Sequence, residues 1–248
     1  MCRFYYIAPC FVLKFSISMR KNCRGRSILL AVLVFMLSTP LYSQDEETSP
    51  FNTGADFYSS YIWRGTKLGT GPAVQPVLEF SSGFFTSGAW GSFDFSGYQE
   101  VDLYLSFSLP SGFSVGITDY YSPDLRYFDY SAASGSHAFE LNLAFSGEKL
   151  NFEADYILNE AGGIGSAGND LYLQAGFSFR HFSLFAGAGN GWLLGDPETD
   201  NDKIKLCNLG LEVSRTIKIT ETFEIPVLGQ LIFNPDREQL FLVVGFTL

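Results

Sequence analysis

Acidic and tyrosine side chains at every second position of strand-like segments are the residues of this sequence best placed to do chemistry. Eight carboxylates and two tyrosines fall on the polar side of such segments: Asp56, Tyr58, Glu79, Asp102, Tyr104, Glu140, Glu153, Asp155, Glu212 and Glu224. Carboxylates that line an enclosed surface attract cations and repel anions. If the segments form a barrel wall, we predict that these ten residues line its pore, with Glu140, Glu153 and Asp155 sharing one wall.

The same carboxylates have a second interpretation, in which they form hydrogen-bonded networks that fill a plugged barrel. Arg64, Arg126, Arg180 and Arg215 are basic residues that could pair with some of them. Eight-stranded barrels are filled by side chains and sixteen-stranded porins are open, so a barrel of about twelve strands is expected to hold a narrow channel. The sequence leaves both interpretations open.

Other residues with catalytic or ligand potential stand in weak contexts. His137 near a loop and His181 in a predicted tight turn lie in no recognisable serine–histidine arrangement, and we interpret both as solvated. The carboxylates of 196–202 lack the spacing of a calcium loop, and the glycines of 162–165 precede no helix, as a phosphate loop would require. Cys207 faces the apolar side and is interpreted as a small hydrophobe. The sequence therefore predicts no enzyme, cofactor or metal site.

Strand-like segments of about ten residues position these side chains. Twelve are predicted, at 54–63, 73–82, 84–95, 100–109, 112–121, 137–146, 150–158, 170–179, 182–189, 205–215, 222–233 and 239–248. The connections after even-numbered segments are short, and most of the others are longer and richer in Gly, Asp and Asn. This alternation is typical of outer-membrane barrels with short periplasmic turns. We therefore predict an all-β, transmembrane, up-and-down antiparallel β-barrel of about 12 strands over residues 54–248.

The two faces of each segment differ in the way that a membrane requires. In 100–109, Val101, Leu103 and Leu105 alternate with Asp102 and Tyr104. Such apolar faces are too large and too aromatic to fill a core of this size, so we predict that they face lipid. Aromatic residues near the loop-side ends are expected to form an interfacial girdle, comprising Tyr61, Trp63, Phe95, Tyr121, Tyr156, Trp192 and Phe233.

The final segment, 239–248, is interpreted as the strand that closes the barrel against the first one. One of its faces is wholly apolar, made of Leu240, Leu242, Val244, Phe246 and Leu248. An apolar last residue with an aromatic residue two positions earlier resembles the insertion signal of bacterial outer-membrane barrels. Barrel-assembly machinery is therefore an expected partner, through this strand. The alternative is the last core strand of a soluble β-sandwich.

The N-terminal region has the pattern of a secretory signal peptide. A basic cluster at 20–26 precedes an apolar run at 28–37 and a small-residue exit before Gln44. The apolar run is too short to span a membrane as a helix. We predict that 1–43 is a signal peptide, with translation starting at Met19, and that 44–53 is an N-terminal periplasmic segment.

Removal of residues 1–43 changes the net charge and the number of cysteines of the exported protein. Removing 1–43 takes away six basic residues and no acidic one, so the 16 basic and 26 acidic residues of the full chain become 10 and 26. This excess of negative charge argues against nucleic acid as a partner. Only Cys207 of the four cysteines lies after the cleavage site, so the exported protein is expected to hold no internal disulfide.

Several spaced motifs in the first half of the chain resemble those of the TorF-type porin family, which consists of conserved hypothetical outer-membrane proteins. In order, these are Ser60-Tyr-Ile-Trp-Arg-Gly65, Gly71-Pro-Ala-Val-Gln-Pro76, Gly83-Phe-Phe-Thr-Ser-Gly-Ala-Trp-Gly-Ser92, Glu100-Val-Asp-Leu-Tyr104, Asp119-Tyr-Tyr-Ser-Pro123 and Phe139-Glu-Leu141. The chain departs from that family in its long 126–136 insertion. The resemblance implies a barrel in the outer membrane of a bacterium and a porin role, without assigning chemistry to individual residues.

Together these observations predict a porin-like channel in outer-membrane lipid. Its solutes are expected to be ions or small polar molecules that cross passively, with a preference for cations because the predicted lining is acidic. Two other functions remain as alternatives. The first is a plugged structural or binding barrel without a through-path, and the second is an outer-membrane enzyme that uses one of the histidines.

Overall fold

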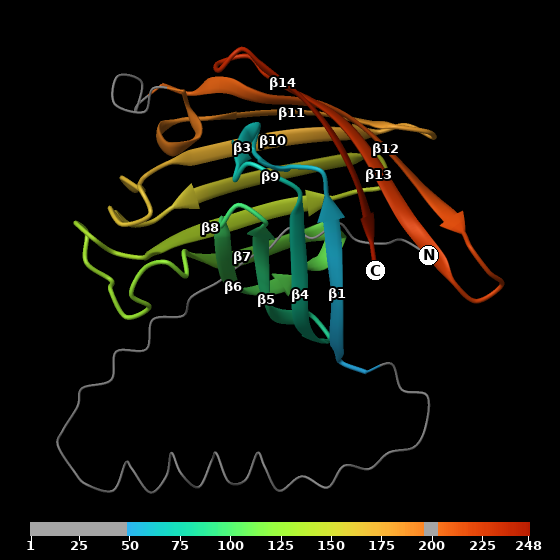
Figure 1. The fold of residues 1–248 in the computed structure, drawn as a ribbon, viewed down its shortest axis with the longest axis horizontal. Coiled ribbons are helices and arrows are strands. Elements are labelled where there is room, and N and C mark those ends of the chain that lie inside the picture. Colours follow the sequence, from blue (N-terminus) through green and yellow to red (C-terminus); the bar gives the residue numbers. More distant parts are fainter. Residues whose placement is uncertain (1–48, 196–202) are drawn as a thin grey trace, which may run out of the picture. The chain divides into compact units, whose positions relative to one another are not determined.

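The computed structural model describes residues 49–195 and 203–248, and twelve of its strands close into one antiparallel barrel. The wall strands are β1 (Phe51–Tyr58), β4 (Ala73–Ser82), β5 (Phe85–Asp94), β6 (Gln99–Ser108), β7 (Phe113–Tyr121), β8 (His137–Ser146), β9 (Leu150–Ile157), β10 (Leu171–Ser178), β11 (Ser183–Gly189), β12 (Lys205–Lys218), β13 (Glu224–Asn234) and β14 (Gln239–Thr247). Each wall strand pairs with its neighbours along the chain (Figure 1). The predicted all-β class, strand count and antiparallel topology are therefore confirmed.

The C-terminal strand closes the barrel, as predicted. β14 pairs with β1 through Asp56↔Thr247, Phe57↔Phe246 and Tyr58↔Gly245, and the two strands lie side by side in Figure 1, in blue and red. The Phe57 and Phe246 rings stack outside this seam with centroids 4.8 Å apart. Closure removes the unpaired strand edges that would otherwise expose backbone groups to lipid.

Alternation along the strands separates a polar interior from an apolar exterior. On β6, Leu103 is 43% exposed whereas Asp102 is 4% exposed; on β8, Leu141 is 37% exposed whereas Glu140 is 1% exposed. Because neighbouring strands are in register, these differences continue around the wall. The outer face is apolar along its full circumference, with many large leucine and phenylalanine side chains exposed. This is the facing that a transmembrane barrel requires.

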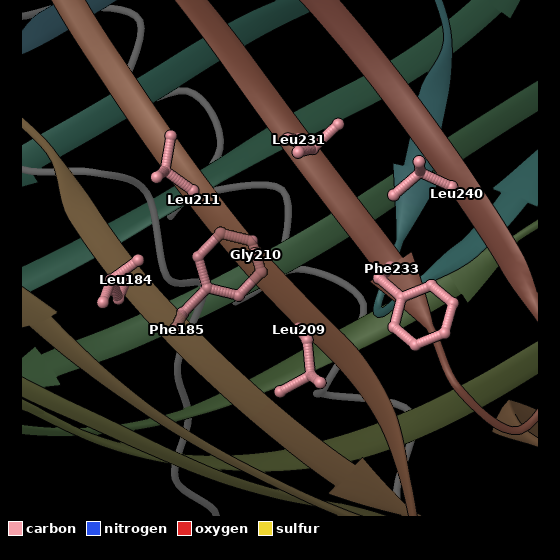
Figure 2. A pocket seen from close by; sticks show the side chains of 8 residues that line it. All are labelled: Leu184, Phe185, Leu209, Gly210, Leu211, Leu231, Phe233 and Leu240. Atoms are coloured by element: carbon pink, nitrogen blue, oxygen red, sulfur yellow. The ribbon is translucent and has the colours of Figure 1, made fainter.

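The outer face also carries a shallow apolar hollow over β11, β12, β13 and β14. It has a volume of about 350 Å³ and is shown in Figure 2. Its lining consists of Leu184, Phe185, Leu209, Gly210, Leu211, Leu231, Phe233 and Leu240. No polar side chain is among them, so this surface suits lipid chains rather than a polar ligand.

The connections alternate in length as predicted. Turns after β4, β6, β8, β10 and β12 are short, and the remaining connections include long ones at 122–136 and 158–170. The two long loops pack together, because Gly162 N–H donates to Ala132 O (2.8 Å) and Gly163 N–H donates to Gly135 O (3.0 Å). The glycines of 162–165 thus belong to a packed pair of loops.

The aromatic girdle differs in part from its prediction. Phe95, Tyr156 and Phe233 are exposed on the outside, but Tyr61, Trp63 and Trp192 pack within the loop-side end of the barrel. Paired rings instead gather at the short-turn end, where Phe84–Phe107, Phe113–Phe145 and Phe179–Phe182 have centroids 4.6–5.9 Å apart. Strand-end position alone does not give the direction in which a ring points.

Two strand assignments need correction. The first wall strand runs from Phe51 to Tyr58, so it begins before the predicted 54–63 and stops earlier, because the chain then turns inward as β2 (Tyr61–Trp63) and β3 (Thr66–Leu68). β12 continues to Lys218 rather than ending at 215. The predicted signal peptide at 1–43 and the acidic stretch at 196–202 lie outside the described residues.

Cys207 points to the opposite side of the wall from that predicted. A β-bulge shifts the register between Gly187 and Ala188, opposite this position of β12, so that Cys207 and Asn208 are both buried. Cys207 packs inside the barrel against Tyr172, Leu193 and Leu194. Its role as a small hydrophobe stands, but it lies in an apolar pocket of the interior and not on the lipid face.

In the part of the chain that the structure describes, helical structure is limited to two short turns, Pro110–Gly112 (η1) and Gly191–Leu193 (η2). Across 49–195 and 203–248, no helix has the length and apolar character needed to cross a membrane.

Candidate functional site: an inward hairpin and two carboxylate clusters

A small hairpin, β2–β3, leaves the wall after β1 and forms a separate two-stranded sheet (β3 is labelled in Figure 1). Trp63 pairs with Thr66, so only Arg64 and Gly65 form the turn, with φ angles of 49° and 82°. Two successive positive φ values are the signature of a type I′ turn, which matches the twist of the strands it joins. The turn places Arg64, a non-glycine residue in a left-handed conformation, at the tip of the hairpin.

The tip of the hairpin is held against β12 and β13, which come late in the chain. Gly65 lies so close to β12 that a Cβ atom built on it would be 2.0 Å from the Cys207 carbonyl oxygen. The Asn234 side-chain amide of β13 donates to Gly65 O at 3.0 Å, and Asn234 is fully buried. Backbone contact on this scale requires glycine, and it fixes the position from which Arg64 extends.

Arg64 reaches a cluster of carboxylates on β8 and β9, here called the arginine cluster (Arg64, Glu140, Glu153 and Asp155). Its Nη1 donates to Glu140 Oε2 at 2.6 Å, and its Nη2 donates to Glu140 Oε1 at 3.0 Å. The same Nη2 lies 2.6 Å from Asp155 Oδ2 and 3.5 Å from Glu153 Oε1. These three carboxylates lie on the neighbouring strands β8 and β9, and one guanidinium bridges them all.

Neutral donors complete this cluster. The Asn142 side-chain amide donates to Glu140 Oε1 (2.7 Å) and to Asp155 Oδ1 (2.8 Å), and the Tyr120 hydroxyl donates to Glu140 Oε1 (2.8 Å). The side chains of Arg64, Glu140 and Asp155 are 9%, 1% and 0% exposed. A charge network at this burial is stable only when its members are paired and hydrogen-bonded, as they are here.

Aromatic rings cover the arginine cluster. The Arg64 guanidinium carbon lies 4.8 Å from the Trp63 ring centroid and 4.5 Å from that of Tyr172. Trp63 in turn packs edge-on against Tyr120 and Trp192, with centroids 5.7 and 5.6 Å away. The hairpin tip, η2 and the loop-side ends of the strands thus meet in one layer inside the barrel.

A second group of inward side chains, here called the uncompensated cluster, contains Glu100, Asp102, Tyr61, Trp90 and Tyr98. Asp102 lies opposite Trp90 of β5 in the strand register, and Glu100 is the next inward residue of β6. The Tyr98 hydroxyl donates to Glu100 Oε2 at 2.8 Å. Tyr61, from the hairpin, packs edge-on against Trp90 and Tyr98 at 5.6 and 6.1 Å.

No basic side chain of the described ranges forms an ion pair with Glu100 or Asp102. Asp102 Oδ1 is buried and has no hydrogen-bond partner within 49–195 and 203–248. A buried acceptor in this state costs about 1–3 kcal/mol, and more when it is charged. A ligand with a donor group would supply the partner that Asp102 Oδ1 lacks.

The remaining predicted lining residues spread over the wall. The Tyr104 hydroxyl donates to Glu79 Oε2 at 3.0 Å, and the Gln230 amide donates to Glu212 Oε2 at 2.8 Å. Asp56 accepts a hydrogen bond from Thr247 at the seam. Two further residues complete the set: the ring of Tyr58 lies over Gly245 of β14, and Glu224 is exposed at the first position of β13.

His137 is buried, which corrects its interpretation as a solvated residue. It is 1% exposed, because the rings of Tyr121, Tyr127 and Tyr130 pack around it. Its Nδ1 lies 2.8 Å from Asp119 Oδ1, and its Nε2 contacts Tyr127 O, a carbonyl that can only accept. Nε2 therefore carries its hydrogen and is not available as a general base. His181 is exposed in the turn between β10 and β11, as predicted.

Within the loop that covers His137, an acidic residue accepts several hydrogen bonds that order the chain. Asp129 accepts hydrogen bonds from Ser131 N–H (3.0 Å), Ser131 Oγ (2.6 Å) and Ser134 Oγ (2.9 Å). These donors hold the pKa of Asp129 below its usual range. The 122–136 loop, which contains the 126–136 insertion, is thus ordered by its own internal bonds.

Sequence reasoning did not identify which arginine pairs with Glu140, Glu153 and Asp155, and of the uncompensated cluster it placed only Asp102 on the inward face. Arg64 was one of four arginines named as candidate partners of the carboxylates. The Arg64-Gly65 dipeptide could have indicated a hairpin there, since glycine at the second position is typical of two-residue hairpin turns. Glu100, Asp102 and Tyr104 stand at every second position of one strand. The alternation of side chains along that strand could therefore have placed Glu100 on the inward face as well.

Metal binding has no evident basis in this interior. Among the described residues, no group of three or more His, Cys, Asp or Glu side chains is arranged to hold a metal ion.

Comparison with known proteins assigns no family. No model of a known protein family matches the chain, so the resemblance to the TorF-type porins has no support from that comparison. A search of curated proteins likewise finds no relative. One matching solved structure, described as "Asymmetric conductivity of engineered proteins", has 11% sequence identity and a TM-score of 0.38. The match covers 71% of this chain and 54% of that one, so the chain spans about half the length of that protein.

Proposed function

We propose that this protein is an outer-membrane channel through which ions and small polar solutes pass, with the β2–β3 hairpin forming its constriction. The observation that carries the proposal is a closed barrel with an apolar outer face and a hydrogen-bonded, carboxylate-rich inner face. An outer face of this kind is stable in lipid and unfavourable in water. The predicted signal peptide supports export, and the apolar C-terminal strand supports insertion by barrel-assembly machinery.

Cation preference follows from the balance of charge at the constriction. Arg64 offers one positive charge to Glu140, Glu153 and Asp155, and the uncompensated cluster adds Glu100 and Asp102 without a basic partner among the described residues. The potential inside a low-dielectric wall with this excess of carboxylates is negative, which raises the local concentration of cations.

A second candidate function, a plugged barrel without a through-path, is favoured by one observation. The hairpin tip is fixed to β8 and β9 by the Arg64 ion pairs and to β13 by the Asn234 hydrogen bond, and Gly65 packs against the Cys207 carbonyl of β12. If these contacts leave no continuous path, the barrel would act through its rim or its interior pockets instead.

Conductance in a planar bilayer separates the two functions. We expect purified protein to give discrete single-channel steps in KCl, and a tenfold KCl gradient to give a reversal potential of the sign for K⁺ selectivity. Absence of steps would support the plugged barrel, and an anion-selective reversal potential would contradict the proposed charge balance.

A further inference from the structure

The uncompensated cluster has a composition that points to a particular ligand. Its two carboxylates lie on β6, and the strand register places Asp102 between Trp90 of β5 and Tyr120 of β7. The hairpin brings the Tyr61 ring against Trp90 and Tyr98 from the lumen side. Carboxylates and aromatic faces therefore meet at one position of the inner wall.

An independent observation indicates that this position lacks a partner. Asp102 is 4% exposed, and its Oδ1 has no hydrogen-bond partner in the described part of the chain. By contrast, Glu140 and Asp155 of the arginine cluster each accept from a guanidinium and from Asn142. Since Oδ1 can only accept when the carboxylate is ionised, the missing partner is a donor, and a cationic donor balances the charge as well.

The side chains of the site limit the kinds of cation that it can bind. Hard metal ions prefer six or more oxygen ligands or near-ideal octahedral geometry, and the described residues supply two carboxylates here with aromatic rings around them. A primary ammonium group has three N–H donors for carboxylate oxygens, and it is attracted to the faces of Trp and Tyr rings. A quaternary ammonium has no N–H donor and would leave Asp102 Oδ1 unsatisfied.

We propose that Glu100 and Asp102 bind the primary ammonium group of a small solute, with Tyr61, Trp90 and Tyr98 forming the aromatic part of the site. This inference rests on the proposed channel function, because it places the site beside the hairpin on the route that a solute would take. Glu100 and Tyr98 are partly exposed near the loop-side end of β6, so the ammonium group enters from that end and reaches Asp102 last. Amines are then the preferred class of cation.

Equilibrium binding tests the site without requiring conduction. The full exported chain in detergent micelles is titrated with methylammonium chloride, tetramethylammonium chloride or KCl by isothermal titration calorimetry. We expect methylammonium to bind at least about tenfold more tightly than the other two cations, because charge-assisted hydrogen bonds are worth more than one tenfold step. Asp102→Asn and Glu100→Gln should each weaken methylammonium binding by about tenfold or more, whereas Glu148→Gln, in the exposed turn between β8 and β9, should leave it unchanged.

Circular dichroism of each variant shows whether the barrel has folded, and two variants are used so that one misfolded protein does not decide the outcome. Equal affinities for methylammonium and tetramethylammonium, or binding that survives both substitutions in folded protein, would overturn the assignment.

Bilayer measurements then separate this inference from the proposed function. With methylammonium on one side and K⁺ on the other, the wild-type reversal potential should indicate preference for methylammonium, and Asp102→Asn should remove that preference while K⁺ remains preferred over chloride. A cation-selective channel with no amine preference in the wild type would overturn the ammonium site and leave the channel function intact. Silent bilayers together with Asp102-dependent methylammonium binding would overturn the channel function and leave the site intact.

Discussion

Two groups of buried carboxylates occupy neighbouring parts of one barrel wall, yet they are compensated in different ways. Glu140, Glu153 and Asp155 on β8 and β9 share Arg64, whereas Glu100 and Asp102 on β6 have no basic partner in the described ranges. Both groups are reached by the same hairpin, which presents Arg64 to one and Tyr61 to the other. The difference shows that the hairpin, rather than the wall, decides which carboxylates are neutralised.

The two clusters therefore have different roles. The arginine cluster fixes the hairpin, since its ion pairs and amide bonds are satisfied on all sides. The uncompensated cluster retains unused acceptor capacity and negative charge, which is what a selective binding site needs. A barrel that neutralised both clusters would have no evident basis for selecting cations at its constriction.

The largest expected effect comes from removing the cation of the arginine cluster. Arg64→Ala should lower the free energy of unfolding by about 3–5 kcal/mol, because it leaves buried carboxylates without their partner. It should also free the hairpin tip and raise single-channel conductance. Urea unfolding of protein reconstituted in lipid measures the first effect, and planar-bilayer recording measures the second.

Arg215→Ala is the matched control for this substitution, because Arg215 is exposed and its guanidinium donates a hydrogen bond to the adjacent Ser214 O. Arg64→Lys should lose less stability than Arg64→Ala, since an ammonium retains the charge but cannot form the bidentate pair with Glu140. Equal stability of Arg64→Ala and Arg215→Ala would mean that the arginine cluster does not hold the hairpin.

Substitutions on the outer face test whether both clusters lie within the span of the membrane. Leu141 is adjacent to Glu140, and Leu103 is adjacent to Asp102, with both leucines exposed on the outside. Leu141→Arg and Leu103→Arg should each cost about 2–4 kcal/mol in lipid, because a charge near the bilayer midplane is expensive. Gln174→Arg, on the inward face of β10, should cost less. A cost at Leu141 alone would place the uncompensated cluster outside the membrane span.

The barrel could be predicted from the sequence because its strands and their order both leave patterns within short stretches of the chain. Alternation of side chains at a period of two identifies strands and faces, and alternation of connection lengths identifies the up-and-down order. Strand boundaries at 73–82 and 137–146 were obtained without error for this reason. The hairpin broke the pattern, since alternation continued from Tyr58 into Tyr61 and Trp63 although the chain had left the wall.

The pairing of charges was not predictable, because it depends on contacts between residues far apart in sequence. Arg64 is 76 residues from Glu140 and 91 from Asp155, and only the inward course of β2–β3 brings them together. Cys207 shows a second limit, since it is the extra residue of a β-bulge in β12, and a bulge changes the side to which a residue points. The alternation of side chains along each strand could place the carboxylates on the inner face. It could not show which of them would pair with a basic side chain.

A smaller effect is expected from adding one methyl group at the hairpin tip. Gly65→Ala would place a Cβ atom against the Cys207 carbonyl, at a position whose φ of 82° also disfavours a side chain. We expect a loss of about 1–3 kcal/mol in the free energy of unfolding and a rise in conductance as the tip moves away. Gly83→Ala is a suitable control, because Gly83 has a φ of 60° and open space around it. Similar conductance changes in both variants would show that the tip does not limit passage.

The smallest effect on stability is expected at Asp102, and it is the most direct test of the difference between the clusters. Asp102→Asn replaces a buried carboxyl group that has no basic partner with an amide of nearly the same volume, so the free energy of unfolding should stay within about 1 kcal/mol of the wild type or rise. Asp155→Asn takes a carboxylate from Arg64 and should reduce stability by a clearly larger amount. Urea unfolding in the same lipid, at one pH and salt concentration, gives both values. Equal losses in the two variants would show that Asp102 has a stabilising partner after all, and the contrast between the clusters would then have no energetic basis.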